Sequence, residues 1–223
     1  MKGITVNELF EMRGTLADGL LKGAVYPFEV FSKIGNFIIK TGTELDPEIY
    51  EQRGENIWIA KSAVVADSAS ITGPCIIGER TQVRHCAFIR GNALVGNDCV
   101  VGNSTELKNV VLIGSVQVPH YNYVGDSVLG FRSHMGAGSI TSNVKSDKTP
   151  VVIKNGGETL ETGLKKMGAV LGDFVEVGCG TVLNPGTVVG KNTNIYPLSM
   201  VRGVIPPNSI YKKSGEIAGK RYD

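Results

Sequence analysis

The chain has 223 residues, a formal net charge of +2, and a composition that is 42% hydrophobic and 20% charged. This length allows a sizeable buried core in one large domain or two small ones. The small, dispersed charge gives no reason to expect a nucleic-acid or membrane partner. No apolar run reaches the roughly 18 residues that span a bilayer, and the N-terminus lacks the pattern of a signal peptide. We therefore expect a cytoplasmic protein.

Residues 1–56 are predicted to form a helical unit. Asn7 and Pro27 precede two apolar stripes at helical spacing, and residues 46–54 suggest a further short helix or a turn. An open end of stacked strands would expose unpaired backbone groups, so we assign these helices to cap the domain that follows. The stripes consist of Leu9, Met12, Leu16 and Leu20, and of Phe28, Phe31, Ile34 and Ile38.

From residue 57 to 211 the sequence has a period of six. A sustained period of six fits neither a helix nor one long strand, but it fits a coil of three short strands joined by three turns. A small or short residue follows most of the aliphatic ones by four positions, so two inward positions are specified in every six residues. The sequence thus predicts an all-β solenoid. The aliphatic positions are Ile59, Val65, Ile71, Ile77, Val83, Ile89, Val95, Val101, Leu107 and Ile113, and then Leu171, Val177, Leu183, Val189, Ile195 and Val201.

Two segments depart from the period. Residues 144–166 are polar and glycine-rich, and we expect them to leave the solenoid surface and reach toward a neighbouring subunit. Residues 212–223 form a tail that we expect to carry little order of its own. Within the repeat, the six-residue frame slips at residues 106–143, where polar groups collect. We expect the chemistry there.

The four cysteines, at positions 75, 86, 99 and 179, lack the CxxC spacing of zinc and redox sites. A chain of this length does not need disulfides to fold. We predict reduced thiols. Cys75 and Cys99 occupy a repeat position otherwise filled by small residues, so we predict that both are buried in the core.

The six-residue repeat, with Gly commonly second and Ser, Thr, Ala or Val fifth, resembles the hexapeptide-repeat acyltransferases. This resemblance alone implies a left-handed parallel β-helix, an exception to the usual right-handed crossover. Three stretches, at residues 102–109, 118–126 and 136–138, are similar to the acetyltransferase domain of glucosamine-1-phosphate acetyltransferase/UDP-N-acetylglucosamine pyrophosphorylases. Residues 164–172 and 183–186 resemble the archaeal sugar-phosphate nucleotidylyltransferase/acetyltransferases. The resemblance covers roughly residues 57–210.

Members of that family normally also carry a nucleotidyltransferase domain with a GxGxRxxP phosphate loop, which this sequence lacks. We therefore expect no pyrophosphorylase activity. The resemblance implies instead an N-acetyltransferase that uses acetyl-CoA as co-substrate, requires no metal, and acts on an amino-sugar phosphate such as glucosamine 1-phosphate. The alternative is a non-catalytic prism that binds sugar nucleotides or serves as a scaffold.

N-acylation by a thioester needs a base, a donor for the oxyanion and groups that fix the sugar phosphate. The resemblance implies that His120 is the base and that Glu106 assists catalysis. His134 stands where many members have Asn, which bears on the sugar accepted. The remaining substrate-binding candidates are Arg90, Lys108, Tyr123, Asn143 and Lys148, and the candidates for coenzyme A binding are Gly136, Ala137, Gly138, Cys179 and Pro197.

The three histidines also raise the question of a zinc site like that of the prism-fold γ-type carbonic anhydrases. His85, His120 and His134 are widely separated in the sequence and form no HxxxxH pair, so we do not expect a metal site. The predicted site residues are split across coils, and in the resembling enzymes the active sites lie between neighbouring prisms. We therefore expect a homotrimer.

Overall fold

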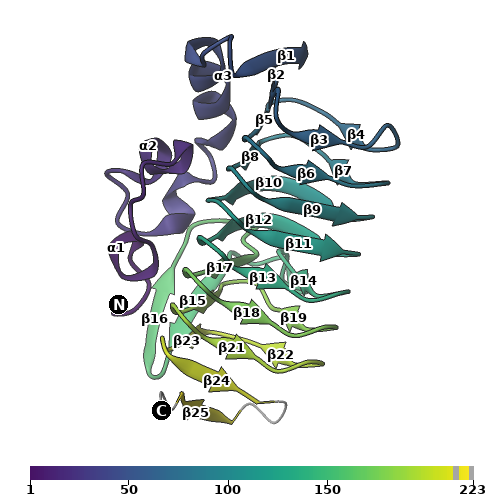
Figure 1. The fold of residues 1–223 in the computed structure, drawn as a ribbon. Helices are drawn as coiled ribbons and strands as arrows, with labels where there is room; N and C mark the ends of the chain where they lie inside the picture. The colour runs from purple at the N-terminus through teal and green to yellow at the C-terminus, as the bar shows by residue number, and fades with distance from the viewer. Residues whose placement is uncertain (213–215, 221–223) are drawn as a thin grey trace.

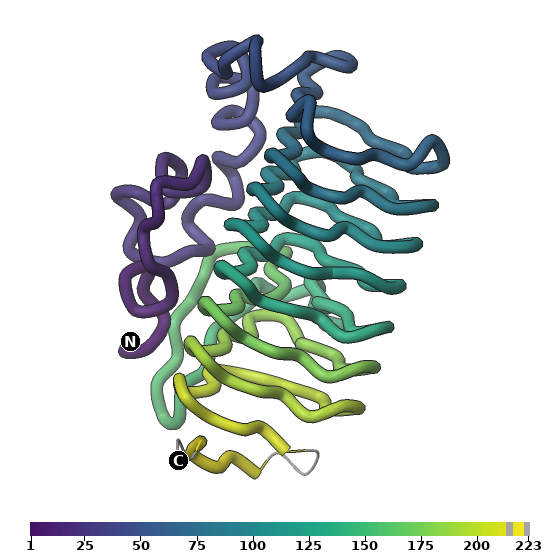
Figure 2. The backbone as a smooth tube through the Cα atoms, viewed as in Figure 1, coloured from purple at the N-terminus to yellow at the C-terminus, as the bar shows by residue number. Residues whose placement is uncertain are grey.

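The computed structural model describes residues 1–212 and 216–220. Most of this chain winds as a left-handed parallel β-helix, so the predicted all-β solenoid is confirmed (Figures 1 and 2). Each coil contributes one short strand to each of three faces. None of the helices in the described residues is long and apolar enough to cross a membrane.

The three faces are numbered here in chain order. Face 1 contains β2 (Ile57–Ala60), β5 (Cys75–Ile77), β8 (Ala93–Val95), the second halves of β10 (Glu106–Leu112) and β12 (Tyr123–Leu129), then β17 (Ala169–Leu171), β20 (Thr187–Val189) and β23 (Val204–Ile205). Face 2 contains β3 (Val64–Val65), β6 (Gln82–Val83), β9 (Val100–Asn103), β11 (Gln117–His120), β13 (His134–Met135), β18 (Glu176–Val177), β21 (Asn194–Ile195) and β24 (Ser209–Tyr211). Face 3 contains β4 (Ser70–Ile71), β7 (Phe88–Ile89), the first halves of β10 and β12, then β14 (Ile140–Thr141), β19 (Val182–Leu183) and β22 (Met200–Val201).

The central coils are one residue shorter than the coils that precede them. Val83 pairs with Val101, whereas Val101 pairs with Val118, so the separation in sequence decreases by one between these two steps. The missing residue is at the corner between faces 3 and 1. Leu112 therefore takes the inward position, and Ile113 packs outside against the N-terminal segment. The prediction that Ile113 is a core residue of the prism was wrong, because a six-residue count cannot register a shortened corner.

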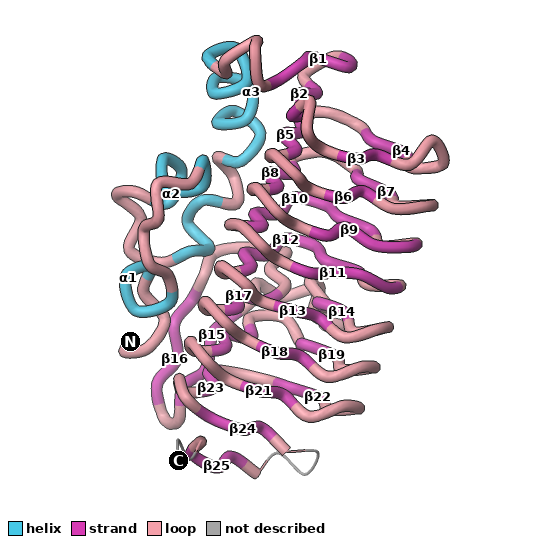
Figure 3. The backbone as a smooth tube through the Cα atoms, viewed as in Figure 1, coloured by secondary structure: helices cyan, strands magenta, loops and turns pink. Residues whose placement is uncertain are grey.

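The N-terminal segment lies along face 1 and not over the end of the prism (Figures 1 and 3). It contains α1 (Val6–Leu9), α2 (Leu16–Leu21), a 3₁₀ helix η1 (Pro27–Val30) and α3 (Ile34–Glu44). The expected end cap was therefore misplaced. The reason is that face 1, unlike an ordinary exposed sheet face, is apolar on its outer side as well. The buried outward residues that it presents to the helices are Ile76, Leu94, Val111, Val128, Val170 and Val188.

Antiparallel strands close the two ends of the prism in place of helices. β1 (Tyr50–Gly54), in the region predicted as a helix or turn, pairs antiparallel with β2. β25 (Ile217–Gly219) pairs antiparallel with β24, so the tail is more ordered there than expected. The rest of the predicted tail, at 213–215 and 221–223, lies outside the described residues. Both ends thus satisfy the backbone groups of a terminal strand.

Residues 144–166 leave the coil but return to it. They form a hairpin of β15 (Val152–Asn155) and β16 (Glu158–Glu161). Val151 and Ile153 are buried against the same cluster that the N-terminal helices cover, and the Asn155 amide donates to the carbonyl of Lys2 at 3.2 Å. Its buried apolar side chains thus pack on the prism of the same chain, while Lys154 and residues 156–159 are exposed, and the expected contact with a neighbouring subunit stays a prediction.

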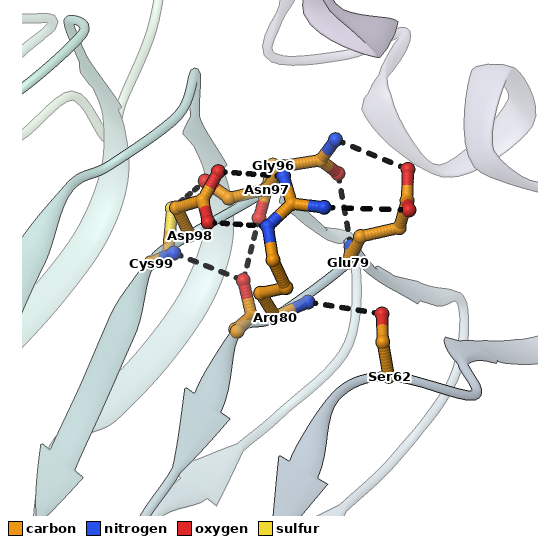
Figure 4. A network of polar contacts seen from close by, with 8 residues as sticks. Ser62, Glu79, Arg80, Gly96, Asn97, Asp98 and Cys99 are labelled. Carbon is orange, nitrogen blue, oxygen red and sulfur yellow. Dashed lines mark hydrogen bonds and ion pairs between the residues drawn. The ribbon is translucent and has the colours of Figure 1, made fainter.

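The corner between faces 1 and 2 shows how the coils are tied together (Figure 4). Arg80 donates to both carboxylate oxygens of Asp98 on the next coil, at 2.7 and 2.9 Å. Beneath this exposed pair, the Thr81 hydroxyl donates to the carbonyl of Gly96 at 2.8 Å and accepts from the backbone N–H of Cys99 at 3.0 Å. The short polar residue of the repeat thus satisfies backbone groups inside the prism, where an unpaired group would be costly.

Candidate functional site

A column of four side chains follows the corner between faces 3 and 1, where the coils are shortened. Asn92, Asn109, Asp126 and Asn143 follow one another at the interval of one shortened coil. The first three have φ values of 48°, 54° and 47°, a left-handed conformation that Asn and Asp tolerate better than other residues. We call this column the Asn/Asp ladder. The sequence analysis missed it, although a search for residues recurring at the shortened interval would have found it.

Asp126 is the centre of the polar contacts at this corner. Its side chain is only 5% exposed, and its carboxylate accepts hydrogen bonds from Lys108 Nζ at 3.1 Å, Asn109 Nδ2 at 2.9 Å and Asn143 Nδ2 at 2.5 Å. Asn143 Nδ2 also donates to the Tyr123 hydroxyl at 3.2 Å. Burial, and then the negative charge of Asp126, raise the pKa of Tyr123 above its ordinary value. Three predicted substrate-binding residues are therefore brought together by a residue to which no role was given.

Arg90 directly follows β7, and Glu106 begins the neighbouring strand β10 of face 3. Arg90 Nη1 is 2.7 Å from Glu106 Oε1, and Glu106 pairs in register with Tyr123 on the next coil. The pair is thus adjacent to the ladder. Glu106, the predicted partner of His120 in catalysis, forms its ion pair with Arg90 and makes no hydrogen bond to the imidazole of His120.

His120 lies at a different corner, between faces 2 and 3. Its side chain is exposed, and its ring makes no hydrogen bond to any residue that the structure describes. The backbone is held firmly, because the His120 N–H donates to Asn122 Oδ1 at 3.1 Å. Asn122 is buried, and its Nδ2 donates to the carbonyls of Gly136 and Ser139 at 2.9 and 3.0 Å. The imidazole is therefore carried on a fixed corner with both ring nitrogens open to a ligand.

The residues predicted to bind coenzyme A continue along the corner of His120. The N–H of Gly138 donates to the carbonyl of His120 at 3.0 Å, and the N–H of Gly180 donates to the carbonyl of Ala137 at 2.9 Å. Gly136 is needed for the stacking of coils, because a Cβ there would lie 2.7 Å from the nitrogen of Cys179. Gly138 has a φ of +68° and faces open space. All five predicted residues, Gly136, Ala137, Gly138, Cys179 and Pro197, lie on this corner.

Two predicted residues join neither group. His134 lies on face 2, where its Nδ1 is 2.8 Å from Glu176 Oε2. Lys148 lies in an exposed turn with a φ of +60°. Among the residues at 1–212 and 216–220, no group of three or more His, Cys, Asp and Glu side chains is arranged to hold a metal ion. Within one chain, the candidate residues thus form two groups on two corners of the prism.

Comparison with known proteins places this arrangement in a family. Residues 71–205 match the model of the GMPPB C-terminal domain. The chain belongs to the GMPPB C-terminal domain family. The match covers most of the coils, including both corners that carry the candidate residues.

Relatives of this member of the GMPPB C-terminal domain family confirm the resemblance drawn from its motifs. It is 29% identical over 217 residues to a "Bifunctional protein GlmU" of Methanococcus maripaludis, covering 96% of this chain and 53% of the relative. It is 31% identical over 105 residues to a "Bifunctional sugar-1-phosphate nucleotidylyltransferase/acetyltransferase" of Sulfurisphaera tokodaii, covering 47% of this chain and 26% of the relative. The chain spans about half the length of the first of these relatives, and its matched part spans about a quarter of the second.

Among solved structures, the chain is similar to PerB from Caulobacter crescentus in complex with CoA and GDP-perosamine. The two are 16% identical, the TM-score is 0.39, and the alignment covers 73% of this chain and 57% of that one.

Proposed function

We propose that the protein is an acetyl-CoA-dependent N-acetyltransferase that acts on an amino-sugar phosphate of the glucosamine 1-phosphate type. The observation that carries the proposal is the corner of His120. The His120 imidazole is exposed and has no hydrogen-bond partner among the described residues, and the His120 carbonyl accepts from the N–H of Gly138, which lies with Ala137 in an exposed turn of the next coil. Histidine is the side chain that most often serves as a general base in enzymes.

In this reaction the amine nitrogen of the sugar attacks the carbonyl carbon of the thioester. His120 takes the proton that the amine loses, the C–N bond forms, and the C–S bond breaks. The proton then passes to the sulfur of coenzyme A. The open space beside Gly138 offers room for the acyl group, while Cys179 and Pro197 extend the same corner for the pantetheine arm.

Four side chains at the ladder corner supply the sugar site. Lys108 and Arg90 carry positive charge suited to a phosphate, and Tyr123 and Asn143 offer hydrogen-bonding groups beside them. Since the His120 corner and the ladder corner are separate edges of one prism, a homotrimer would complete the site by bringing the corner of one chain against a neighbouring chain. His134 and Lys148 would then meet substrate only across such an interface.

The proposal is tested by incubating the purified protein with acetyl-CoA and one of three acceptors, namely glucosamine 1-phosphate, galactosamine 1-phosphate or a nucleotide-linked amino sugar. Release of free thiol is followed in the presence of EDTA. We expect turnover with at least one sugar phosphate, unaffected by the chelator. Absence of turnover with all acceptors would count against the enzyme.

A second function is favoured by the pairing of charges at the ladder corner. Lys108 is already bound to Asp126, and Arg90 to Glu106, so two cations proposed for phosphate are neutralised within the chain. A non-catalytic prism that binds sugar nucleotides or serves as a scaffold would fit this pairing. Calorimetry that detects binding of UDP-N-acetylglucosamine, together with no acetyl transfer to any acceptor, would support this function over the first.

A further inference from the structure

The Asn/Asp ladder contains one carboxylate among three amides. A carboxamide both donates and accepts hydrogen bonds, whereas an ionised carboxylate only accepts. Every neighbour of Asp126 must therefore turn a donor toward it. The contacts agree with this requirement, because Asn109 and Asn143 both point Nδ2 at the carboxylate, at 2.9 and 2.5 Å.

This requirement fixes the orientation of the Asn143 amide. Its Nδ2 group serves both Asp126 and the Tyr123 hydroxyl, the latter at 3.2 Å. Because the amide is planar, the oxygen Oδ1 is turned to the opposite side. Asn143 is thereby held as a hydrogen-bond acceptor at the surface of the corner. With an amide in place of Asp126, either orientation of Asn143 would be possible.

Asp126 also holds the ammonium group of Lys108, with Nζ at 3.1 and 3.3 Å from its two oxygens. The exposures of the two side chains differ, since that of Lys108 is 27% exposed and that of Asp126 is 5% exposed. Lys108 can therefore meet a ligand, while Asp126 lies behind it. A buried ion pair is weak evidence of stabilisation in itself, because desolvation opposes the attraction.

We propose that Asp126 is a positioning residue for the sugar site. It fixes Asn143 with its amide oxygen toward the acceptor sugar and fixes Lys108 beside it. The substrate group that meets Asn143 is then a hydrogen-bond donor, a hydroxyl or an amine, and the phosphate is left to the cation. This role rests on the proposed function, in which Lys108, Tyr123 and Asn143 bind the amino-sugar phosphate.

The test compares Asp126→Asn with Asn109→Gly. Both changes remove a contact from the ladder, and glycine keeps the left-handed backbone at 109, but Asn109 is not assigned to the sugar site. We expect Asp126→Asn to raise KM for the sugar phosphate about 10- to 100-fold, the scale of loss when a binding group is misplaced. KM for acetyl-CoA should change by less than about 2-fold. Asn109→Gly should lower the melting temperature without changing either KM.

A further variant separates positioning from direct contact. If Asp126 acts through its two partners, Asp126→Asn should have no additional effect on KM when Lys108→Met and Asn143→Ala are already present. A further loss in that background would overturn the role. So would an active enzyme in which Asp126→Asn and Asn109→Gly both lower the melting temperature and leave the sugar KM unchanged, since the ladder would then only hold coils together. A wild-type chain that neither turns over nor binds glucosamine 1-phosphate in calorimetry would overturn the proposed function, and this role with it.

Discussion

At the scale of single residues, the proposal depends most on His120. The change His120→Ala should lower turnover about 10²–10⁴-fold, the usual contribution of a positioned base. The melting temperature should hardly change, because the exposed ring makes no contact that stabilises the coil. His85 is a matched control, since it is an exposed histidine on the same corner that hydrogen-bonds to Ser68 at 3.2 Å. His85→Ala should keep its activity, whereas a His120→Ala enzyme with the wild-type rate from pH 6 to 9 would contradict the role and direct attention to His134.

Two of the four cysteines are buried and two are exposed. Burial of Cys75 and Cys99 was predicted from the sequence. Both are fully buried, and burial raises the pKa of the Cys99 thiol to about 12 and that of Cys75 still further. Cys86 and Cys179 are exposed. Because the thiolate is the reactive form, titration with a thiol reagent should modify two cysteines in the native protein and four after unfolding. Rapid modification of four thiols under native conditions would show that the prism opens readily.

At the scale of the elements, the six-residue period predicted the coil but not its exceptions. Side chains such as Val83 and Val101 point inward at every sixth position, because each strand and corner of the prism repeats the same geometry. At the shortened corners after Leu107 and Val124, counting in sixes no longer identifies the inward residues. These corners also create the ladder, whose polar contacts depend on the loss of one residue per coil that is seen in the pairing of the strands.

The positions of the two non-repeat segments depend on the outward side chains of face 1, which the six-residue period does not predict. The inward positions of the hexad are conspicuous, but the apolar outward residues of face 1, such as Leu94 and Val128, determine where other elements pack. They explain why the N-terminal helices lie along the side of the prism. They also explain why Val151 and Ile153 fold back onto it, although the surrounding polar residues suggested a projecting loop.

One buried carboxylate fastens the N-terminal segment to the prism. Asp173 accepts from the N–H groups of Glu11 and Phe131, each at 2.9 Å, and its own N–H donates to the carbonyl of Leu9 at 3.0 Å. Asp173→Asn should cost about 1–3 kcal/mol in the free energy of unfolding, because one backbone donor would face the amide NH₂ and remain unpaired. Denaturant titration measures this loss, and Asp67→Asn, on an exposed corner, is the control.

The same residue gives the stability a dependence on pH. Desolvation raises the pKa of Asp173 above its ordinary value of 3.8, so the folded chain binds this proton more tightly than the unfolded chain. The contribution of Asp173 to stability is therefore largest below pH 3.8 and decreases as pH rises through the raised folded pKa. The difference in unfolding free energy between wild type and Asp173→Asn should change in that window and be constant well above it. A difference that is independent of pH throughout would contradict the assignment.

At the scale of the whole molecule, the motifs identified the candidate residues but not their distribution. The stretch of residues 118–126 contains both His120 and Asp126, yet the two lie on different corners because the first half of β12, on face 3, runs between them. Sequence spacing alone does not show which edge a residue occupies after the frame slips. The grouping of Lys108, Tyr123 and Asn143, in contrast, follows from the shortened register of adjacent coils.

This separation makes assembly the decisive property of the molecule. Face 1 is covered by the chain's own N-terminal segment, so a neighbouring chain must use another surface. Face 3 is the better candidate, because it exposes Phe88 and Met200, with 42% and 63% of their surface accessible, next to the corner of His120.

We expect sedimentation to give three times the mass of one chain. The double change Phe88→Glu and Met200→Glu should yield a folded monomer. Its turnover should fall by at least about 100-fold, since the two corners no longer meet. Val64→Glu, at an equally exposed apolar residue on face 2, should remain a trimer with wild-type turnover. A wild-type monomer that is fully active at micromolar concentration would show that one prism suffices, and both the trimer and the shared site would then be wrong.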